Sequence, residues 1–181
     1  MAFLVAAVVL VAALALLNLL LTLGVMRRLR EQAELLSARG SGEGVDQGVM
    51  PAGATIGEFV TSAVDDTAVT SQDLSEDTLV GFFSPQCQPC RDRVPEFISF
   101  LESVPAAERK ALAVVIGDHS DTSEMVAQLT PVARVITGSA AEPIVEAFDT
   151  KSYPALYRMG DDGLIAASGH GMSVLPALAA A

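Results

Sequence analysis

The segment Thr78–Ser99 constrains the fold more than any other part of the chain. It begins with an apolar run, Thr78–Phe83, that is rich in β-branched and aromatic residues, a composition typical of a buried strand. Ser84 and Pro85 end this run, and two cysteines follow with two residues between them, Cys87-Gln88-Pro89-Cys90. Proline is tolerated in the first turn of a helix, where backbone N–H groups have no intrahelical partner. The sequence therefore predicts a buried strand, a tight turn and a helix that opens on the cysteine pair.

The spacing of Cys87 and Cys90 points to redox chemistry. Residues three apart lie on one face of a helix, so the two sulfurs can close a disulfide. The helix N-terminus and its free N–H groups favour an anion, which at Cys87 is a thiolate. A thiolate is the nucleophile in thiol–disulfide exchange, and Cys90 is placed to resolve the mixed disulfide. We therefore predict that Cys87 and Cys90 are the catalytic pair.

Two other uses of a Cys-x-x-Cys pair fit less well. A structural zinc site needs four ligands, but the chain has no third cysteine and its only histidines are His119 and His170. Both histidines are expected to lie in loops, exposed to solvent, and to take no part in catalysis. A purely structural disulfide within one helical turn closes too short a loop to constrain the chain. We therefore expect neither a metal ion nor a cofactor.

The stretch FFSPQCQPCRDRVPEF resembles the active-site segment of thioredoxin-fold proteins. It is most similar to the membrane-anchored TlpA/ResA type and, within that type, to the MauD-like branch. Pro95 matches the helix-kinking proline of that fold, and the resemblance extends over about residues 51–175. It implies an α/β, thioredoxin-like three-layer sandwich. The residues that it assigns to the active-site loop are Ser84, Pro85, Gln88 and Pro89.

Tyr153 and Pro154 form the second part of the resemblance. Only about 5–6% of X–Pro bonds in folded proteins are cis, so the residues alone predict a trans bond. The resemblance implies instead a cis-proline that faces the two cysteines. Such a proline leaves the backbone of Tyr153 free to pair with an extended substrate segment. The alternative for the Tyr153 side chain is an aromatic residue that only packs in the core.

The sequence departs from the family pattern at two positions. Thioredoxins carry a buried Asp where this chain has Gly81, and the TlpA/ResA type often has a Glu where this chain has Arg93. Without these carboxylates the proton acceptor for Cys90 is unassigned. Helical spacing places two cations near the thiols, Arg91 and Arg93, and directs two carboxylates to solvent, Asp92 and Glu96.

The rest of the domain alternates between predicted strands and helices, which favours an α/β sandwich. The strands are expected at 68–70, 111–116, 132–136, 155–159 and 164–168, with a turn at 161–163 between the last two. The helices are expected at 88–101, 106–110, 122–129, 142–148 and 172–181.

The N-terminal segment has a different composition. Phe3–Met26 carries no charged side chain and is about long enough to cross a bilayer. It lacks the basic start and short apolar region of a cleaved signal peptide. We therefore predict a transmembrane anchor and juxtamembrane helix over residues 1–39, a flexible Gly-rich linker over 40–53 and the thioredoxin-like domain over 54–181.

Charge is distributed unevenly along the chain. The net charge is −11, but from Ser41 onward there are 7 basic and 20 acidic side chains, a net of −13. An acidic domain of this kind repels nucleic acid and anionic lipid. Nucleic acid is therefore excluded as a partner.

The resemblance implies a membrane-tethered thiol-disulfide oxidoreductase. Its partners would be protein dithiol or disulfide substrates and an electron-donating thiol partner, either in the membrane or soluble. The reductase direction is favoured, because oxidants often carry a His between the cysteines and this chain has Gln88 and Pro89 there. Two alternatives remain open. One is a thiol peroxidase, which would need a Thr where Ser84 stands, and the other is a thioredoxin-fold docking module without catalysis.

Two arguments about the membrane side disagree. The resemblance predicts a single-pass protein of the cell membrane with its domain outside the cytoplasm. However, Arg27, Arg28 and Arg30 directly follow the apolar segment, and positive charge beside a span favours the cytoplasmic side. We favour the extracytoplasmic placement, because a tether is most useful to a domain that would otherwise diffuse away.

Overall fold

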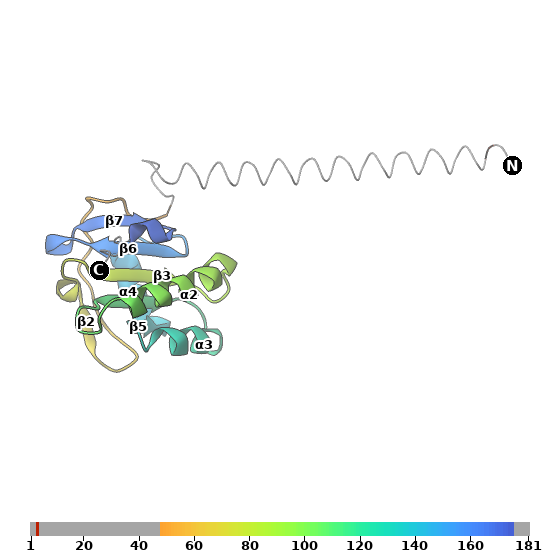
Figure 1. The fold of residues 1–181 in the computed structure, drawn as a ribbon, viewed down its shortest axis with the longest axis horizontal. Coiled ribbons are helices and arrows are strands. Elements are labelled where there is room, and N and C mark those ends of the chain that lie inside the picture. Colours follow the sequence, from red (N-terminus) through yellow and green to blue (C-terminus); the bar gives the residue numbers. More distant parts are fainter. Residues whose placement is uncertain (1–2, 4–47, 176–181) are drawn as a thin grey trace. The chain divides into compact units, whose positions relative to one another are not determined.

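The structure is a computed structural model that describes Phe3 and residues 48–175 (Figure 1). All helices and strands named below lie in one compact unit, Val45–Ala181. A five-stranded mixed sheet with strand order β5-β4-β3-β6-β7 forms its centre. The strands are β3 (Leu79–Phe83), β4 (Ala111–Val115), β5 (Arg134–Thr137), β6 (Ala155–Met159) and β7 (Ile165–Gly169). The helices are α2 (Gln88–Ser103), α3 (His119–Leu129) and α4 (Glu142–Ala147).

Strand β3 occupies the middle of the sheet, as its composition predicts. It pairs in parallel with β4 and antiparallel with β6, and all five of its residues are buried. Side chains on a strand alternate between the two faces. Phe83 accordingly packs with the α2 residues Val94 and Phe97, and Phe82 packs with Ile144 of α4 on the opposite face.

Helices cover both faces of the sheet, which confirms the expected three-layer α/β sandwich (Figure 1). Helix α2 buries Val94, Phe97 and Leu101 on one face, and α3 adds Met125 and Leu129 to the same cluster. Helix α4 covers the other face together with the segment before β1. Pro95 lies inside α2, as the resemblance implies, and the helix continues beyond it to Ser103.

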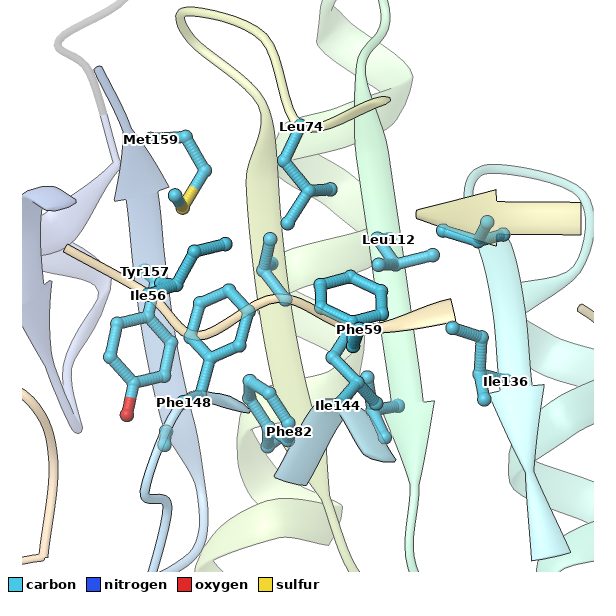
Figure 2. Close-up of a cluster of buried hydrophobic side chains, with 14 of the residues drawn as sticks. Ile56, Phe59, Leu74, Phe82, Leu112, Ile136, Ile144, Phe148, Tyr157 and Met159 are labelled. Carbon is cyan, nitrogen blue, oxygen red and sulfur yellow. The ribbon is translucent and has the colours of Figure 1, made fainter. Parts of the chain in front are cut away.

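Three aromatic rings pack against one another in the cluster on the α4 face of the sheet (Figure 2). The ring centroids of Phe82 and Phe148 are 5.2 Å apart, and Tyr157 lies 5.6 Å from the first ring and 4.9 Å from the second. Tilted aromatic pairs of this kind contribute about 0.5–1.5 kcal/mol each beyond area burial. Since Tyr157 belongs to β6, this cluster joins α4 to the strand that directly follows Pro154.

Local structure differs from the sequence prediction in three places. Residues 106–110 do not form the expected helix: 106–108 make a turn, in which Glu108 N donates to Pro105 O over 2.9 Å. A short strand, β1 (Val60–Ser62), was not predicted and pairs antiparallel with β2 (Ala68–Thr70). The expected C-terminal helix is described only as far as residue 175, where it is a short 3₁₀ turn, η4 (Met172–Val174).

The expected anchor lies outside the described residues except for Phe3, as does the linker up to residue 47. No helix in the described part of the chain is long and apolar enough to span a membrane. Residues 48–53, which the sequence assigned to the linker, pack onto the domain. Val49 is buried, and Lys151 N donates to Gly48 O over 2.8 Å. The folded domain therefore begins at least six residues before Ala54.

Candidate active site

Cys87 occupies the start of α2, where the sequence placed it. After β3 ends, the chain turns sharply, and Cys87 N donates to Ser84 O over 3.1 Å. Cys87 is the N-cap residue of α2, with extended backbone angles (φ −95°, ψ 115°). Its carbonyl oxygen accepts hydrogen bonds from the N–H groups of Cys90 (3.1 Å) and Arg91 (3.2 Å). The cysteine pair therefore sits on the first helical turn, directly beyond the central strand.

The two thiols have different environments. Both cysteines are free, Cys87 is half-buried, and Cys90 is 0% exposed. Burial raises the pKa of the Cys90 thiol to about 12, and the neighbouring Cys87 thiol adds to the shift. A hydrogen bond with the Ser84 backbone and the positive charge of Arg91 oppose it in part. Of the two cysteines, only Cys87 is partly exposed to solvent.

The loop that carries Tyr153 and Pro154 lies against Cys87. The Tyr153–Pro154 bond is cis, which confirms what the resemblance implied. The Cys87 thiol donates to the carbonyl oxygen of Tyr153 over 3.4 Å. Burial raises the pKa of the Tyr153 hydroxyl, and the nearby Cys90 thiolate charge raises it further. The structure thus brings together Cys87, Cys90, Tyr153 and Pro154, the four residues that the sequence singled out for reaction and docking.

His170 is a member of this site that the sequence analysis did not identify. It was expected to be solvent-exposed, but it is half-buried directly after β7. Its Nδ1 forms a hydrogen bond with the carbonyl oxygen of Pro154, and its Nε2 lies 3.4 Å from Ser152 Oγ. The signal in the sequence is a histidine flanked by two glycines after the last strand, which does not reveal what the loop contacts.

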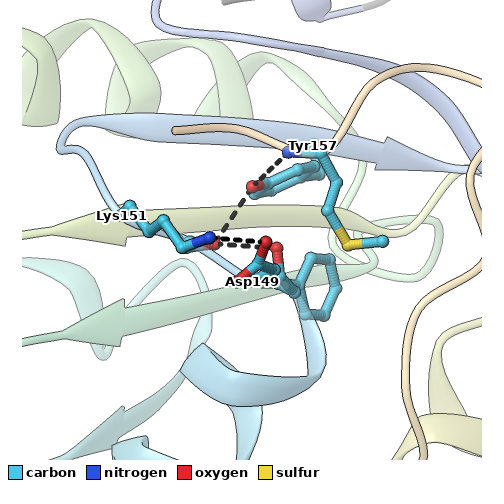
Figure 3. Close-up of polar contacts among 6 residues, drawn as sticks. Asp149, Lys151 and Tyr157 are labelled. Carbon is cyan, nitrogen blue, oxygen red and sulfur yellow. Dashed lines mark hydrogen bonds and ion pairs between the residues drawn. The ribbon is translucent and has the colours of Figure 1, made fainter. Parts of the chain in front are cut away.

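The segment that leads into this loop is fixed by Tyr157 (Figure 3). The buried Tyr157 hydroxyl lies 3.0 Å from Thr150 Oγ1 and accepts a hydrogen bond from Met50 N over 3.3 Å. An exposed ion pair between Lys151 Nζ and Asp149 (2.9 Å) lies beside it. Strand β6 therefore holds both the start of the loop and the beginning of the domain.

The predicted active-site loop residues differ in exposure, and of the four only the Ser84 backbone is among the groups that influence the Cys90 thiol. Gln88 and Pro89 are exposed, and Ser84 and Pro85 are half-buried. Arg91 donates to the Pro85 carbonyl and, through its Nε, to Gln88 Oε1 over 3.2 Å. These contacts of Arg91 stabilise the turn between β3 and α2.

The structure also shows what stands where the family carboxylates are missing. A Cβ on Gly81 would lie 2.6 Å from the Phe83 ring, so that ring fills the space. Arg93 pairs with Glu96 instead of approaching the thiols, whereas Arg91 does influence Cys90 as expected. Asp92 is exposed and accepts a hydrogen bond from Gln88 Nε2 over 2.8 Å. The charges that surround Cys90 are thus those of Cys87 and Arg91.

A hollow of about 440 Å³ opens beside Tyr153. Its lining combines apolar side chains with two carboxylates and includes Ile116, Asp118, Glu142, Val145 and Tyr153. Within the described residues, no group of three or more His, Cys, Asp or Glu side chains could hold a metal ion. The chemistry that this part of the chain offers is that of two thiols, one of which contacts the Tyr153 carbonyl.

Comparison with solved structures supports the fold assignment. The chain is similar to the thioredoxin domain of a thiol-disulfide oxidoreductase from Bacteroides vulgatus, with a TM-score of 0.56 and 13% identity over 69% of this chain and 93% of that one. It is also similar to a putative thioredoxin from Neisseria meningitidis, with a TM-score of 0.53 and 22% identity over 68% and 81% of the two chains. A thiol:disulfide interchange protein of the thioredoxin family from Chlorobium tepidum gives 0.52, with 17% identity over 67% and 87%.

No protein-family model matches the sequence, and no curated protein matches it. At these low identities the structural likeness establishes the fold alone. The domain therefore has a thioredoxin-like α/β fold with a mixed sheet, as the sequence predicted.

Proposed function

We propose that this chain is a thiol-disulfide oxidoreductase that exchanges disulfides with partner proteins through Cys87 and Cys90. One observation carries the proposal: a half-exposed thiol and a buried thiol share the first turn of α2, and the outer one bonds to the Tyr153 carbonyl over 3.4 Å. A purely structural pair would not need one accessible sulfur beside a docking edge. The similar proteins described above as thiol-disulfide oxidoreductases agree with this use of the fold.

In the reductive direction the reaction has two steps. The Cys87 thiolate attacks one sulfur of a substrate disulfide, a mixed disulfide forms, and the other substrate sulfur leaves as a thiolate. Cys90 then attacks the Cys87 sulfur, which closes the Cys87–Cys90 disulfide and releases the second substrate thiolate. Two electrons pass to the substrate. A thiol partner that supplies two electrons must then reduce the enzyme again.

The second step requires that Cys90 lose its proton. With a pKa of about 12, this thiol is almost fully protonated near neutral pH, and no carboxylate is among the groups that set its pKa. The substrate thiolate released in the first step is a base that forms next to the mixed disulfide. We infer that this leaving thiolate takes the Cys90 proton, which couples resolution to substrate departure.

A trapping experiment tests the exchange reaction. In Cys90→Ser the mixed disulfide on Cys87 cannot be resolved, so incubation with a disulfide-bonded protein such as insulin should give a covalent adduct that reductant releases. The variant with both cysteines replaced should give none. Adducts that form equally well through Cys90 in Cys87→Ser would refute the assignment of roles.

We propose the reductase direction, supported by the resemblance to the TlpA/ResA type and by the absence of a histidine between the cysteines. The reduction potential of the pair decides this point. Equilibration with glutathione should place it nearer the value of thioredoxin, about −270 mV, than that of the oxidant DsbA, about −120 mV. A value near the latter would assign the protein to disulfide formation. Turnover of hydrogen peroxide by the reduced protein would identify a thiol peroxidase instead.

We further propose that the domain is tethered to the cell membrane by residues 1–39 and lies outside the cytoplasm, in the manner of the MauD-like branch. The uncharged segment Phe3–Met26 supports the anchor. A membrane-impermeant maleimide applied to intact, reduced cells should label Cys87 without lysis. Labelling only after lysis would mean that Arg27, Arg28 and Arg30 hold the domain on the cytoplasmic side.

A further inference from the structure

One imidazole contacts the residues on both sides of Tyr153. The Nδ1 atom of His170 bonds to the Pro154 carbonyl oxygen, and its Nε2 lies 3.4 Å from Ser152 Oγ. A carbonyl oxygen can only accept, so Nδ1 must carry the hydrogen. A hydroxyl can donate or accept, so the contact with Ser152 is available whether or not Nε2 is protonated. The ring can therefore bond to both residues at the same time.

The residue between these two anchored positions is the one that faces the reactive sulfur. Tyr153 presents its carbonyl oxygen to Cys87 Sγ at 3.4 Å. A shift of Ser152 or Pro154 would move this carbonyl relative to the sulfur. The histidine reaches the loop from the end of β7, whose last residue, Gly169, is paired with Leu156 of β6. The ring is thus held by the sheet itself.

The loop is also supported from the side of the N-terminal segment. A Cβ on Gly48 would lie 2.6 Å from Ser152 Oγ, so the backbone of this segment is packed directly against the serine. Directly before this serine in the chain, Lys151 N donates to Gly48 O over 2.8 Å. Ser152 therefore lies between the backbone at Gly48 and the imidazole of His170.

We propose that His170 is a positioning residue for disulfide exchange: it holds Ser152 and Pro154 and so sets the Tyr153 carbonyl as the docking edge for a protein disulfide. The inference rests on the proposed function. It acts through its contacts with Ser152 and Pro154, so its expected effect is on substrate binding and not on the chemistry at Cys87. Small disulfides, which do not pair with a backbone edge, do not depend on it.

The test follows single-turnover oxidation of the reduced full-length protein by excess insulin, with acid quenching and alkylation to count the remaining thiols. In His170→Ala the half-saturating insulin concentration should rise about tenfold, equivalent to about 1.4 kcal/mol, with the plateau rate unchanged. A change of this kind marks lost binding and not lost transition-state stabilisation. Reaction with the small disulfide 5,5′-dithiobis(2-nitrobenzoic acid) should stay within about twofold of wild type.

Two further variants separate positioning from a general effect on structure. In His170→Asn the amide nitrogen can donate to the Pro154 carbonyl from the place of Nδ1, so insulin binding should largely recover. Lys151→Ala is the matched control, because this residue lies in the same loop and its side chain pairs with the exposed Asp149. It should behave as wild type with both disulfides.

Each outcome decides one of the two proposals. Failure of the wild-type protein to react with either disulfide overturns the proposed function. If the wild-type protein reacts with both disulfides and insulin binding is unchanged in His170→Ala, the positioning role alone is overturned. An equal loss of reaction with both disulfides in His170→Ala also overturns it. For a His170→Ala chain that fails to fold, Ser152→Ala replaces it: a rise of about two- to fivefold in half-saturation is expected from one lost hydrogen bond, and no rise overturns the role.

Discussion

Burial of Cys90 should make this thiol unreactive in the folded protein and reactive in the unfolded chain. The Cys87→Ser variant isolates it and keeps burial, the largest cause of its raised pKa. At pH 8, a thiol with the ordinary pKa of 9.0 is about one-tenth ionised, whereas a thiol with a pKa of about 12 is ionised to about one part in 10⁴. The thiolate population therefore falls by up to about 10³-fold on folding.

Nucleophilicity recovers part of this loss. A thiolate of higher pKa is more reactive, with a Brønsted coefficient of about 0.4–0.5. Between a pKa of 9.0 and one of about 12, the rate constant of the thiolate therefore rises about 20-fold. The net slowing expected from ionisation is thus up to about 50-fold, and it is smaller to the extent that removal of Cys87 lowers the pKa of Cys90. The 0% exposure of Cys90 slows the reaction further.

The assay is alkylation by iodoacetamide, followed by mass, in native buffer and in denaturant. The native rate should be at least about tenfold slower at pH 8, and its logarithm should keep rising with pH well beyond pH 9, where the unfolded rate levels off. A native rate within about threefold of the unfolded rate would show that Cys90 is neither buried nor shifted, and the assignment of the two cysteines would fail with it.

The same shift predicts how stability depends on pH. Above pH 9.0 the unfolded state releases the Cys90 proton while the folded state retains it, up to about pH 12. Stability therefore falls as the pH rises through this window and is fully present below it. Urea titrations of the reduced and disulfide forms at pH 8 and pH 10.5 should show a larger loss for the reduced form.

Two substitutions test how the docking loop is supported, both by urea denaturation. Gly48→Ala should destabilise the domain by about 1–3 kcal/mol more than Gly53→Ala. Both glycines have positive φ (91° and 85°), but only a Cβ on Gly48 would meet Ser152 Oγ at 2.6 Å. Equal losses of stability in the two variants would show that Gly48 does not pack there. Tyr157→Phe removes a buried hydroxyl 3.0 Å from Thr150 Oγ1 and should cost about 1–2 kcal/mol; a loss below about 0.3 kcal/mol would contradict the bond.

The elements that sequence predicted well are those with a strong local pattern. The apolar run of β3, the cysteine turn and α2 all follow from residue type and spacing. Strand β1 was missed because two of its three residues are exposed and its burial alternates only over this short length. The polar stretch 106–110 was assigned to a helix on composition, but it contains only a turn between α2 and β4.

The parts of the site that sequence could not predict depend on contacts between distant segments. Ser152 meets Gly48 from one side, although Gly48 lies 104 positions earlier in the chain, and it meets His170 from the other side. A histidine between two glycines gives no local sign of which carbonyl it will reach. The Gly-rich composition of residues 48–53 likewise predicts a free linker, but Val49 is buried in the domain.

The missing carboxylate near Cys90 is best understood as a consequence of core packing. The space that a side chain at Gly81 would need is filled by the Phe83 ring, which in turn packs against Phe97 with centroids 5.4 Å apart. An aspartate introduced at this position alone would overlap the ring and bury an unpaired charge, so it would destabilise the domain without gaining a proton acceptor. Strand β3 therefore has an aromatic contact behind the buried thiol and no carboxylate of its own at this position. In the proposed mechanism the proton of Cys90 therefore leaves with the substrate thiolate, past Cys87 and the Tyr153 carbonyl, and resolution is expected to depend on the partner that is bound there.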